Sequence, residues 1–192
     1  MANKENKSPE FVKRNSIVSG KGYAHLLNAL KERFRKSQIR AAVCVNTAML
    51  EFYWDMGRDI SKLRESAKWG TAFFDCLSLD LKAEFPEQTG FSVTNIKYAM
   101  RWYEFYSQNN IIRHQAGDEF EMPIDFGHIP WKHHVAIFTH SKSVNEALFY
   151  IEKTIENGWS RSQLEAEIGD DLYNKHGKAI NNFARLYTFV YQ

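Results

Sequence analysis

Two pairs of side chains have the residue types that metal binding or hydrolysis requires. His133 and His134 are adjacent, so on a helix their side chains point about 100° apart and do not share one metal ion. Asp80 and Lys82 form an Asp-x-Lys pair, which some Mg²⁺-dependent nucleases carry on a β-strand. Here the pair lies inside an amphipathic helical pattern, where positions two apart diverge. We therefore expect the histidines at the surface or partly packed, and Asp80 and Lys82 on a solvated helix face.

The sequence lacks the short motifs by which common catalytic sites are identified. It contains no phosphate-binding loop, no dinucleotide fingerprint, no HExxH zinc helix and no nucleophile elbow. We therefore predict that the chain is not an enzyme and that it uses no cofactor and no metal ion. Its function is expected to depend on binding.

The composition also indicates the compartment. No apolar run approaches the roughly eighteen residues of a membrane span, and the first twenty residues lack the apolar stretch of a signal peptide. Cys44 and Cys76 both fall within apolar helical patterns, which favours buried free thiols over a disulfide. We expect a cytoplasmic protein with no membrane partner.

The most informative candidate surface lies between residues 93 and 108. On a helical wheel these residues divide into two sides. The mostly apolar side carries Val93, Ile96, Met100, Tyr103 and Ser107. The opposite side is mixed and carries Thr94, Lys97, Tyr98, Arg101 and Phe105. Lys97 and Arg101 can reach phosphates or guanine edges, and Thr94 lies near the helix N-terminus, where backbone N–H groups favour an anion. The mixed side predicts a DNA-recognition helix. Alternatively, Tyr98, Trp102 and Phe105 are buried against another helix and the cations only fringe that contact.

A second basic surface lies in residues 31–40, which contain five cations and one acid. The formal net charge of the whole chain is only +2, so nucleic-acid binding would depend on such a local patch. If the helix at residues 93–108 contacts DNA, Arg33, Lys36 and Arg40 are the natural flanking phosphate contacts. The alternative is that these cations form the solvated side of a helix.

Helical periodicity dominates the elements that must position these residues. Apolar side chains recur at spacings of three and four over residues 23–63, which predicts one long amphipathic helix or two nearly collinear ones, with Gly57 as the weak point. A helix this long usually packs against a partner helix, so we expect a homodimer. The fold class is therefore all-α, with further helices expected over residues 71–85, 93–108, 131–139, 144–156 and 160–168.

The boundary between the helices expected at residues 71–85 and 93–108 is the best marked. Pro86 ends the helix at residues 71–85, and Ser92 caps the next one, with Phe91 and Ile96 as its hydrophobic staple. Two helices joined by a turn of about six residues are typical of a helix-turn-helix. Residues 109–130 lack a helical period and are either a surface loop or the hairpin of a winged helix.

Capping signals also mark the later helices. Ser143 with Glu146, and Ser160 with Gln163, have the spacing of capping boxes. Gly158 supplies the stop signal between them, because glycine readily adopts the left-handed conformation that ends a helix. These residues predict two successive helices near the C-terminal end of the domain.

Several sequence blocks, taken together in their order, carry a family resemblance. They are residues 46–60 (NTAMLEFYWDMGRDI), 90–92 (GFS) with Asn95 and Ile96, 129–131 (IPW), 156–160 (ENGWS), 172–173 (LY) and 177–179 (GKA) with Asn182 and Phe183. The chain resembles the N-terminal domain of the bacterial YhcG family over about residues 23–183. Longer members of that family continue into a PD-(D/E)xK nuclease domain, and the resemblance implies a helical, helix-turn-helix-like DNA-binding module.

This resemblance sets the expected domain organisation. We expect a flexible basic arm at residues 1–21, the YhcG-like helical domain at residues 22–183 and a divergent tail at residues 184–192. The nuclease domain is expected to be absent, as in a truncated or frameshifted member. Nuclease activity is therefore not carried over, since no residue of this sequence matches the nuclease motif.

The combined prediction is a non-catalytic DNA-binding module of a YhcG-type nuclease system. Its expected DNA contacts are the hydroxyl, aromatic and basic residues of the two candidate surfaces: Thr94, Lys97, Tyr98, Arg101, Arg33, Lys36 and Arg40. The alternative is a protein-interaction or dimerisation domain that docks to a nuclease subunit or to itself without touching DNA. In that case Tyr98, Trp102 and Phe105 are the expected docking side chains.

Overall fold

The chain is helical through most of the residues that its structure describes. The structure is a computed structural model, and it describes residues 21–66, 70, 72–107 and 122–176. These residues form seven α-helices and two short 3₁₀ helices and include no strand, which confirms the expected all-α class. Residues 1–20 of the expected arm, residues 109–121 of the expected loop or wing, and the expected tail lie outside the described residues.

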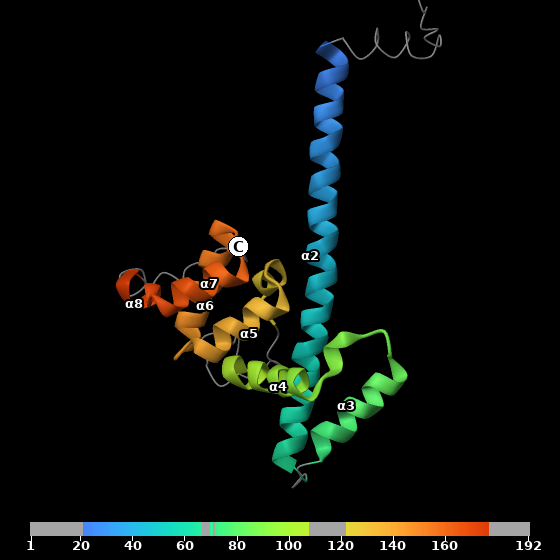
Figure 1. Cartoon of the computed structure of the whole chain (residues 1–192), viewed down its shortest axis with the longest axis vertical. Coiled ribbons are helices and arrows are strands. Elements are labelled where there is room, and N and C mark those ends of the chain that lie inside the picture. The colour runs from blue at the N-terminus through green and yellow to red at the C-terminus, as the bar shows by residue number, and fades with distance from the viewer. Residues whose placement is uncertain (1–20, 67–69, 71, 108–121, 177–192) are drawn as a thin grey trace, which may run out of the picture. The chain divides into compact units, whose positions relative to one another are not determined.

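The longest element is α2 (Lys21–Ser66), a helix of 46 residues (Figure 1). It confirms the long helix expected over residues 23–63, and it continues through Gly57 as a single α-helix. The chain divides into two units after Val43. Since α2 contributes residues to both units, its two halves have different surroundings.

The first unit contributes residues 21–43 of α2, and most of their side chains are exposed. Large apolar side chains are among them: Leu26, Leu30, Phe34 and Ile39. The first three are spaced four residues apart, so they follow one stripe along the helix. We call Leu26, Leu30 and Phe34 the α2 stripe.

The second unit has an aromatic core centred on Trp54 of α2. The ring of Trp54 packs edge-on against Trp102 of α4 (Val93–Ser107), with 5.0 Å between the ring centroids. It also lies 6.4 Å from the ring of Phe126, which belongs to the 3₁₀ helix η3 (Ile124–His128). Edge-to-face geometry is favourable for such rings, and each ring buries a large apolar area. The second half of α2, α4 and η3 therefore share one hydrophobic core.

Gly57 allows α2 and α4 to approach each other closely. It is buried, and a Cβ atom built at this position would collide with the carbonyl oxygen of Ala99 in α4. Only glycine leaves room for a neighbouring backbone at this distance. Gly57 therefore sets the packing of the two helices and does not interrupt α2.

Asn46 holds the segment before α5 (Trp131–His140) against α2. Its Nδ2 atom donates hydrogen bonds to the carbonyl oxygens of Gly127 (2.9 Å) and Ile129 (2.8 Å). Backbone acceptors that leave water need a partner of this kind. One amide therefore positions the start of α5 relative to the second half of α2.

The helix pair expected around Pro86 is present. It consists of α3 (Phe73–Glu84), the 3₁₀ helix η1 (Thr89–Phe91) and α4. Ser92 caps α4 as expected, since its Oγ accepts from the N–H of Asn95 (3.2 Å). Ser78 of α3 is buried and donates to the carbonyl oxygen of Phe91 (2.6 Å), which fixes the turn to α3.

A small second cluster joins α3 to α4 and to the end of α2. Ile60, Ile96 and Met100 are buried in it, and three apolar residues of α3 pack against them: Phe74, Leu77 and Leu81. Phe85, which follows α3 at the same helical spacing, is exposed. Because α3 is covered on this side only, most of its other side chains face solvent.

Helix α5 packs against both α6 (Val144–Asn157) and α7 (Arg161–Gly169). The expected caps are present: Ser143 accepts from the N–H of Glu146, and Gly158 ends α6 in the left-handed conformation at φ 60°. The carboxylate of Glu146 accepts from the N–H of Lys142 (2.7 Å), so it closes the cap one residue earlier than a capping box would.

The last described helices continue this layer. Ser160 and Gln163 form the expected capping box at the start of α7, with both reciprocal hydrogen bonds present. A short helix that the sequence did not predict, α8 (Leu172–His176), follows the positive φ of Asp171. Its residue Tyr173 packs its ring 5.4 Å from that of Phe149, which places α8 against α6.

The expectation of buried thiols is wrong. Cys44 and Cys76 are both free and exposed. The helical patterns around them are real, but Cys76 lies off the stripe that α3 turns toward α4, and Cys44 faces solvent on α2. In the part of the chain that the structure describes, no helix is long and apolar enough to span a membrane.

Candidate functional site

A narrow exposed stripe of α4 carries three of the expected DNA contacts. Thr94, Lys97 and Arg101 are exposed and lie at helical spacings of three and four. The rest of α4 is covered on two sides, by the small cluster of Ile96 and Met100 and by the aromatic core. The available surface is therefore narrower than the helical wheel predicts. We call Thr94, Lys97 and Arg101 the α4 stripe.

The aromatic residues of α4 are packed inside the second unit. The ring of Tyr98 lies 5.9 Å from that of Phe138 in α5, and the ring of Phe105 lies 6.3 Å from it, so both are half-buried. Trp102 is fully buried. The expectation that Trp102 could dock to a partner is therefore wrong, because the core already uses this side chain.

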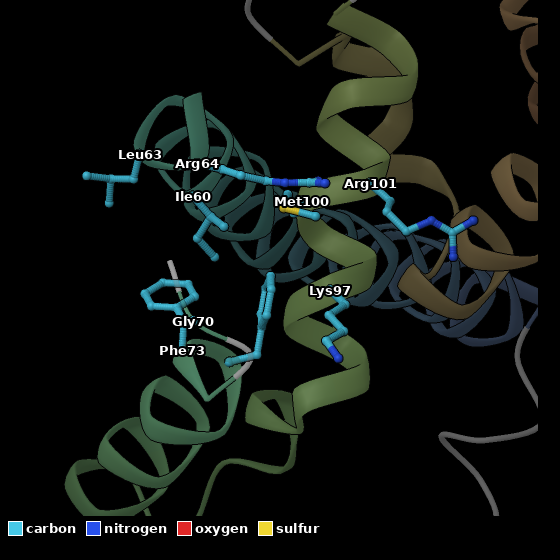
Figure 2. A pocket seen from close by; sticks show the side chains of 9 residues that line it. Ile60, Leu63, Arg64, Gly70, Phe73, Lys97, Met100 and Arg101 are labelled. Carbon is cyan, nitrogen blue, oxygen red and sulfur yellow. The ribbon is translucent and has the colours of Figure 1, made fainter. Parts of the chain in front are cut away.

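Beside the α4 stripe lies a cleft between the end of α2, the start of α3 and α4. Its volume is about 440 Å³, and Figure 2 shows the side chains around it. The described residues that line it are apolar or basic: Ile60, Leu63, Arg64, Gly70, Phe73, Phe74, Lys97, Met100 and Arg101. All the elements that form the cleft belong to the second unit.

The three cations of the cleft have different neighbours. Arg64 reaches from α2 toward α4, where its Nη1 lies 3.8 Å from Oε1 of Glu104. The same carboxylate accepts a hydrogen bond from Ser61 (3.2 Å). Because the Arg64 side chain is mostly exposed, its ion pair is weak and exchangeable. Glu104 therefore only partly offsets the positive charge at this end of the cleft.

Lys97 and Arg101 rest on aromatic rings. The Nζ atom of Lys97 lies 5.2 Å from the ring centroid of Phe74, and the guanidinium carbon of Arg101 lies 5.9 Å from the centroids of both Tyr98 and Phe138. These cation–π contacts orient the two side chains without neutralising them. Both charges remain available to an anion in solution.

The basic residues expected to flank this surface lie in the first unit. Arg33, Lys36 and Arg40 are exposed on α2. Within the same run, Nη1 of Arg35 lies 3.2 Å from Oε1 of Glu32, so part of the positive charge is paired internally. The first unit thus presents its own basic surface, which belongs to a different unit from the α4 stripe.

His134 is more deeply buried than the sequence predicts. It is fully buried in the aromatic core, and its Nε2 donates to the carbonyl oxygen of Phe126 (2.9 Å). Burial lowers the pKa of His134 to about 4, which keeps the ring neutral near pH 7. The neighbouring His133 is half-buried and donates from Nε2 to the carbonyl oxygen of Trp159 (3.1 Å). Both histidines therefore have structural roles.

The other chemically suggestive residues are not gathered into a site. Asp80 and Lys82 are both exposed on α3, as expected of a solvated helix face. Among the described residues, no group of three or more His, Cys, Asp and Glu side chains is arranged to hold a metal ion. The surface around the cleft is therefore the strongest candidate for function.

Sequence reasoning missed part of this surface. Arg64 and Phe73 both line the cleft beside Lys97, but they are not among the site residues that the sequence predicts. Their local patterns carry no signal, because Arg64 ends one helix and Phe73 begins another. The packing of α2 and α3 against α4 brings these positions together.

Comparisons with known proteins identify the family of the chain. No curated protein and no solved structure matches the chain. Residues 29–175 match the model of one protein family, described as the DUF1016 N-terminal domain. The match covers most of the chain and agrees with the resemblance to the N-terminal domain of the YhcG family. The chain therefore belongs to the DUF1016 N-terminal domain family.

Proposed function

We propose that the chain is a non-catalytic DNA-binding module of a YhcG-type nuclease system and that it contacts DNA through α4. The observation that carries this proposal is the α4 stripe, in which Lys97 and Arg101 stay exposed on a helix that is otherwise covered. Arg64 adds a third cation beside them. Exposed cations on one side of a capped helix suit contacts with phosphates and base edges.

The arrangement around α4 supports a helix-turn-helix mode of binding. In such a motif the second helix lies in the major groove and the first helix crosses behind it. Here α3 packs on the side of α4 that carries Ile96 and Met100, whereas Thr94 and Lys97 face solvent. Tyr98 is half-buried, so its proposed role is to support Arg101, whose guanidinium lies over the Tyr98 ring.

A salt titration of DNA binding tests this proposal. Lys97→Ala and Arg101→Ala should each weaken binding to a duplex, and each should reduce the slope of log affinity against log salt by about one, because each removes one phosphate contact. Lys175→Ala is the matched control, since Lys175 is exposed on α8, away from this surface. Binding that is absent, or that does not change with salt, would contradict the proposal.

The first unit offers the flanking contacts. Replacing Arg33, Lys36 and Arg40 together by alanine should reduce the salt slope further and weaken binding of all duplexes equally, since phosphates carry no sequence information. Arg35 pairs with Glu32, so Arg35→Ala should have the smaller effect and serves as the comparison.

A second candidate function, self-association, is favoured by the α2 stripe. Leu26, Leu30 and Phe34 are 56%, 50% and 64% exposed, which is unusual for large apolar side chains that repeat along one helix. We propose that a second copy of the chain covers them in a helix–helix contact, because apolar side chains along one face of a long helix can pack against the same face of its own copy. The chain would then dock to itself, with or without DNA.

Sedimentation of dilute protein tests this assignment. Leu30→Glu combined with Phe34→Glu should convert a dimer into a monomer, because four carboxylates would face one another across the contact. Leu79→Glu is the control, since Leu79 is an exposed apolar residue of α3 outside the stripe. A wild-type protein that sediments as a monomer at micromolar concentration would rule out the dimer.

A further inference from the structure

We propose that the cleft between α2, α3 and α4 binds an unpaired nucleobase, so that the chain prefers DNA with a displaced nucleotide over a fully paired duplex. This inference rests on the proposed function, because it assigns a ligand class to the surface beside the α4 stripe. It concerns the cleft itself, whereas the proposed function concerns the exposed cations.

The size and lining of the cleft fit one nucleotide. A volume of about 440 Å³ lies within the range of roughly 300–1,000 Å³ that small-molecule sites occupy. Ile60 and Met100 form part of an apolar wall, and both are buried in the small cluster behind the cleft. An apolar wall of this kind favours a flat, weakly hydrated ring over a polar group.

Aromatic side chains give the cleft a stacking surface. Phe73 and Phe74 begin α3, are half-buried, and have ring centroids 5.2 Å apart with a T-shaped geometry. The exposed Lys97 side chain lies over the ring of Phe74. A base that stacks on this ring would replace the ammonium group and free it to bind a phosphate. Stacking of bases on aromatic rings adds about 1–3 kcal/mol per base in proteins that bind unpaired nucleotides.

The charge of the rim selects a nucleotide over other flat molecules. Arg64, Lys97 and Arg101 line the cleft, and the described residues of its lining include no acidic side chain. A nucleotide brings both parts of the complement, an apolar ring for the wall and phosphates for the rim. Arg64 can exchange the carboxylate of Glu104 for a phosphate, because that ion pair is long and solvent-exposed.

A paired duplex cannot fill the cleft. Its bases are stacked and hydrogen-bonded inside the helix, so only the backbone and the base edges in the groove reach the α4 stripe. A base must leave the stack to enter, and this costs least where the base is already unpaired. Preference for an unpaired nucleotide is therefore the signature of cleft occupancy.

Fluorescence anisotropy with three labelled DNAs tests the inference. The probes are a fully paired duplex, the same duplex with one unpaired nucleotide, and that duplex with an abasic residue at the unpaired position. The wild-type chain should bind the second about tenfold more tightly than the first and the third, because only the second offers a base to stack. Equal affinity for all three would overturn this inference and leave the proposed function intact. Affinity for none of them would overturn both.

Two conservative variants locate the preference. Phe73→Leu keeps apolar volume at the cleft and removes one aromatic face, so the tenfold preference should fall to about twofold while affinity for the paired duplex stays constant. Phe74→Leu should lower the preference as well, and because it also removes the ring beneath Lys97, it should weaken binding to the paired duplex too. Leu79→Ala, on the solvent side of α3, should leave the preference unchanged. A preference that survives in both phenylalanine variants would place the unpaired base elsewhere and refute the assignment to the cleft.

Discussion

The two halves of α2 share one helical period but differ in what surrounds them. In the second half Trp54 is only 2% exposed and contacts a core of aromatic rings, whereas Phe34 in the first half is 64% exposed. Both are aromatic residues of the same helix. The difference shows that an apolar stripe specifies a helix face that tends to be covered, while it does not specify what covers it.

This contrast has a direct functional meaning. The second half of α2 is covered by α4 and η3 and so acts as a scaffold for the α4 stripe. The first half keeps its apolar and basic side chains on the surface, where they are available to partners. Three pairs of matched substitutions measure how far this difference extends, each pairing a residue of the second unit with one from the first half of α2.

The largest effect is expected for the aromatic pair. Trp54→Ala should lower the free energy of unfolding by about 4 kcal/mol, because it leaves a cavity among Trp102, Tyr106 and Phe126. Phe34→Ala should change it by less than about 0.5 kcal/mol in dilute protein. Urea unfolding followed by circular dichroism gives both values, and similar losses would mean that the first half is covered as well.

The second effect is a pH dependence. The unfolded His134 binds a proton below about pH 6.5 and the folded one only below about pH 4, so the unfolded state holds more protons between these values. The contribution of His134 to stability is complete above pH 6.5 and is lost as the pH falls toward 4. The loss should amount to about 3 kcal/mol.

Urea midpoints at pH 7.5 and pH 4.5 measure this contribution. His134→Gln should show a smaller decrease between the two pH values than the wild-type protein. His25→Gln, at an exposed position in the first half of α2, should keep the full decrease. If both variants keep it, the acid sensitivity originates in other groups.

The smallest of the three effects concerns glycine. Gly57→Ala should destabilise the protein by about 2 kcal/mol, because the added methyl group collides with the backbone of α4. Nothing lies within 4 Å of a Cβ at Gly22, so Gly22→Ala should be neutral or stabilise by up to about 1 kcal/mol through helix propensity. In thermal unfolding, Gly57→Ala should lower the Tm, whereas Gly22→Ala should leave the Tm unchanged or raise it.

The helices themselves could be predicted from the sequence because their signals are local. Caps such as Ser92 and Ser160 act within three residues, and the apolar period of α2 is legible along its whole length. The exposure of Cys44 and Cys76 could not be predicted in this way. Whether a position on an apolar helix is covered depends on residues far away in the chain.

The candidate site shows the same limit. The exposure of Lys97 and Arg101 follows from the α4 pattern, but the burial of Trp102 depends on a ring contact with Trp54, 48 positions earlier in the sequence. The cleft is even less local, since three separate helices form it. Periodicity finds the faces of single helices, and concave surfaces arise only from how those helices cross.

The free and exposed thiols of Cys44 and Cys76 make the native sequence suitable for covalent labelling. Cys44 follows the last residue of the first unit, and Cys76 lies in the first turns of α3, close in sequence to Phe73 and Phe74. A maleimide dye on one position would sense changes near the boundary of the two units, and a dye on the other would sense changes near the cleft. Each thiol becomes an independent reporter after a single Cys→Ser exchange at the other.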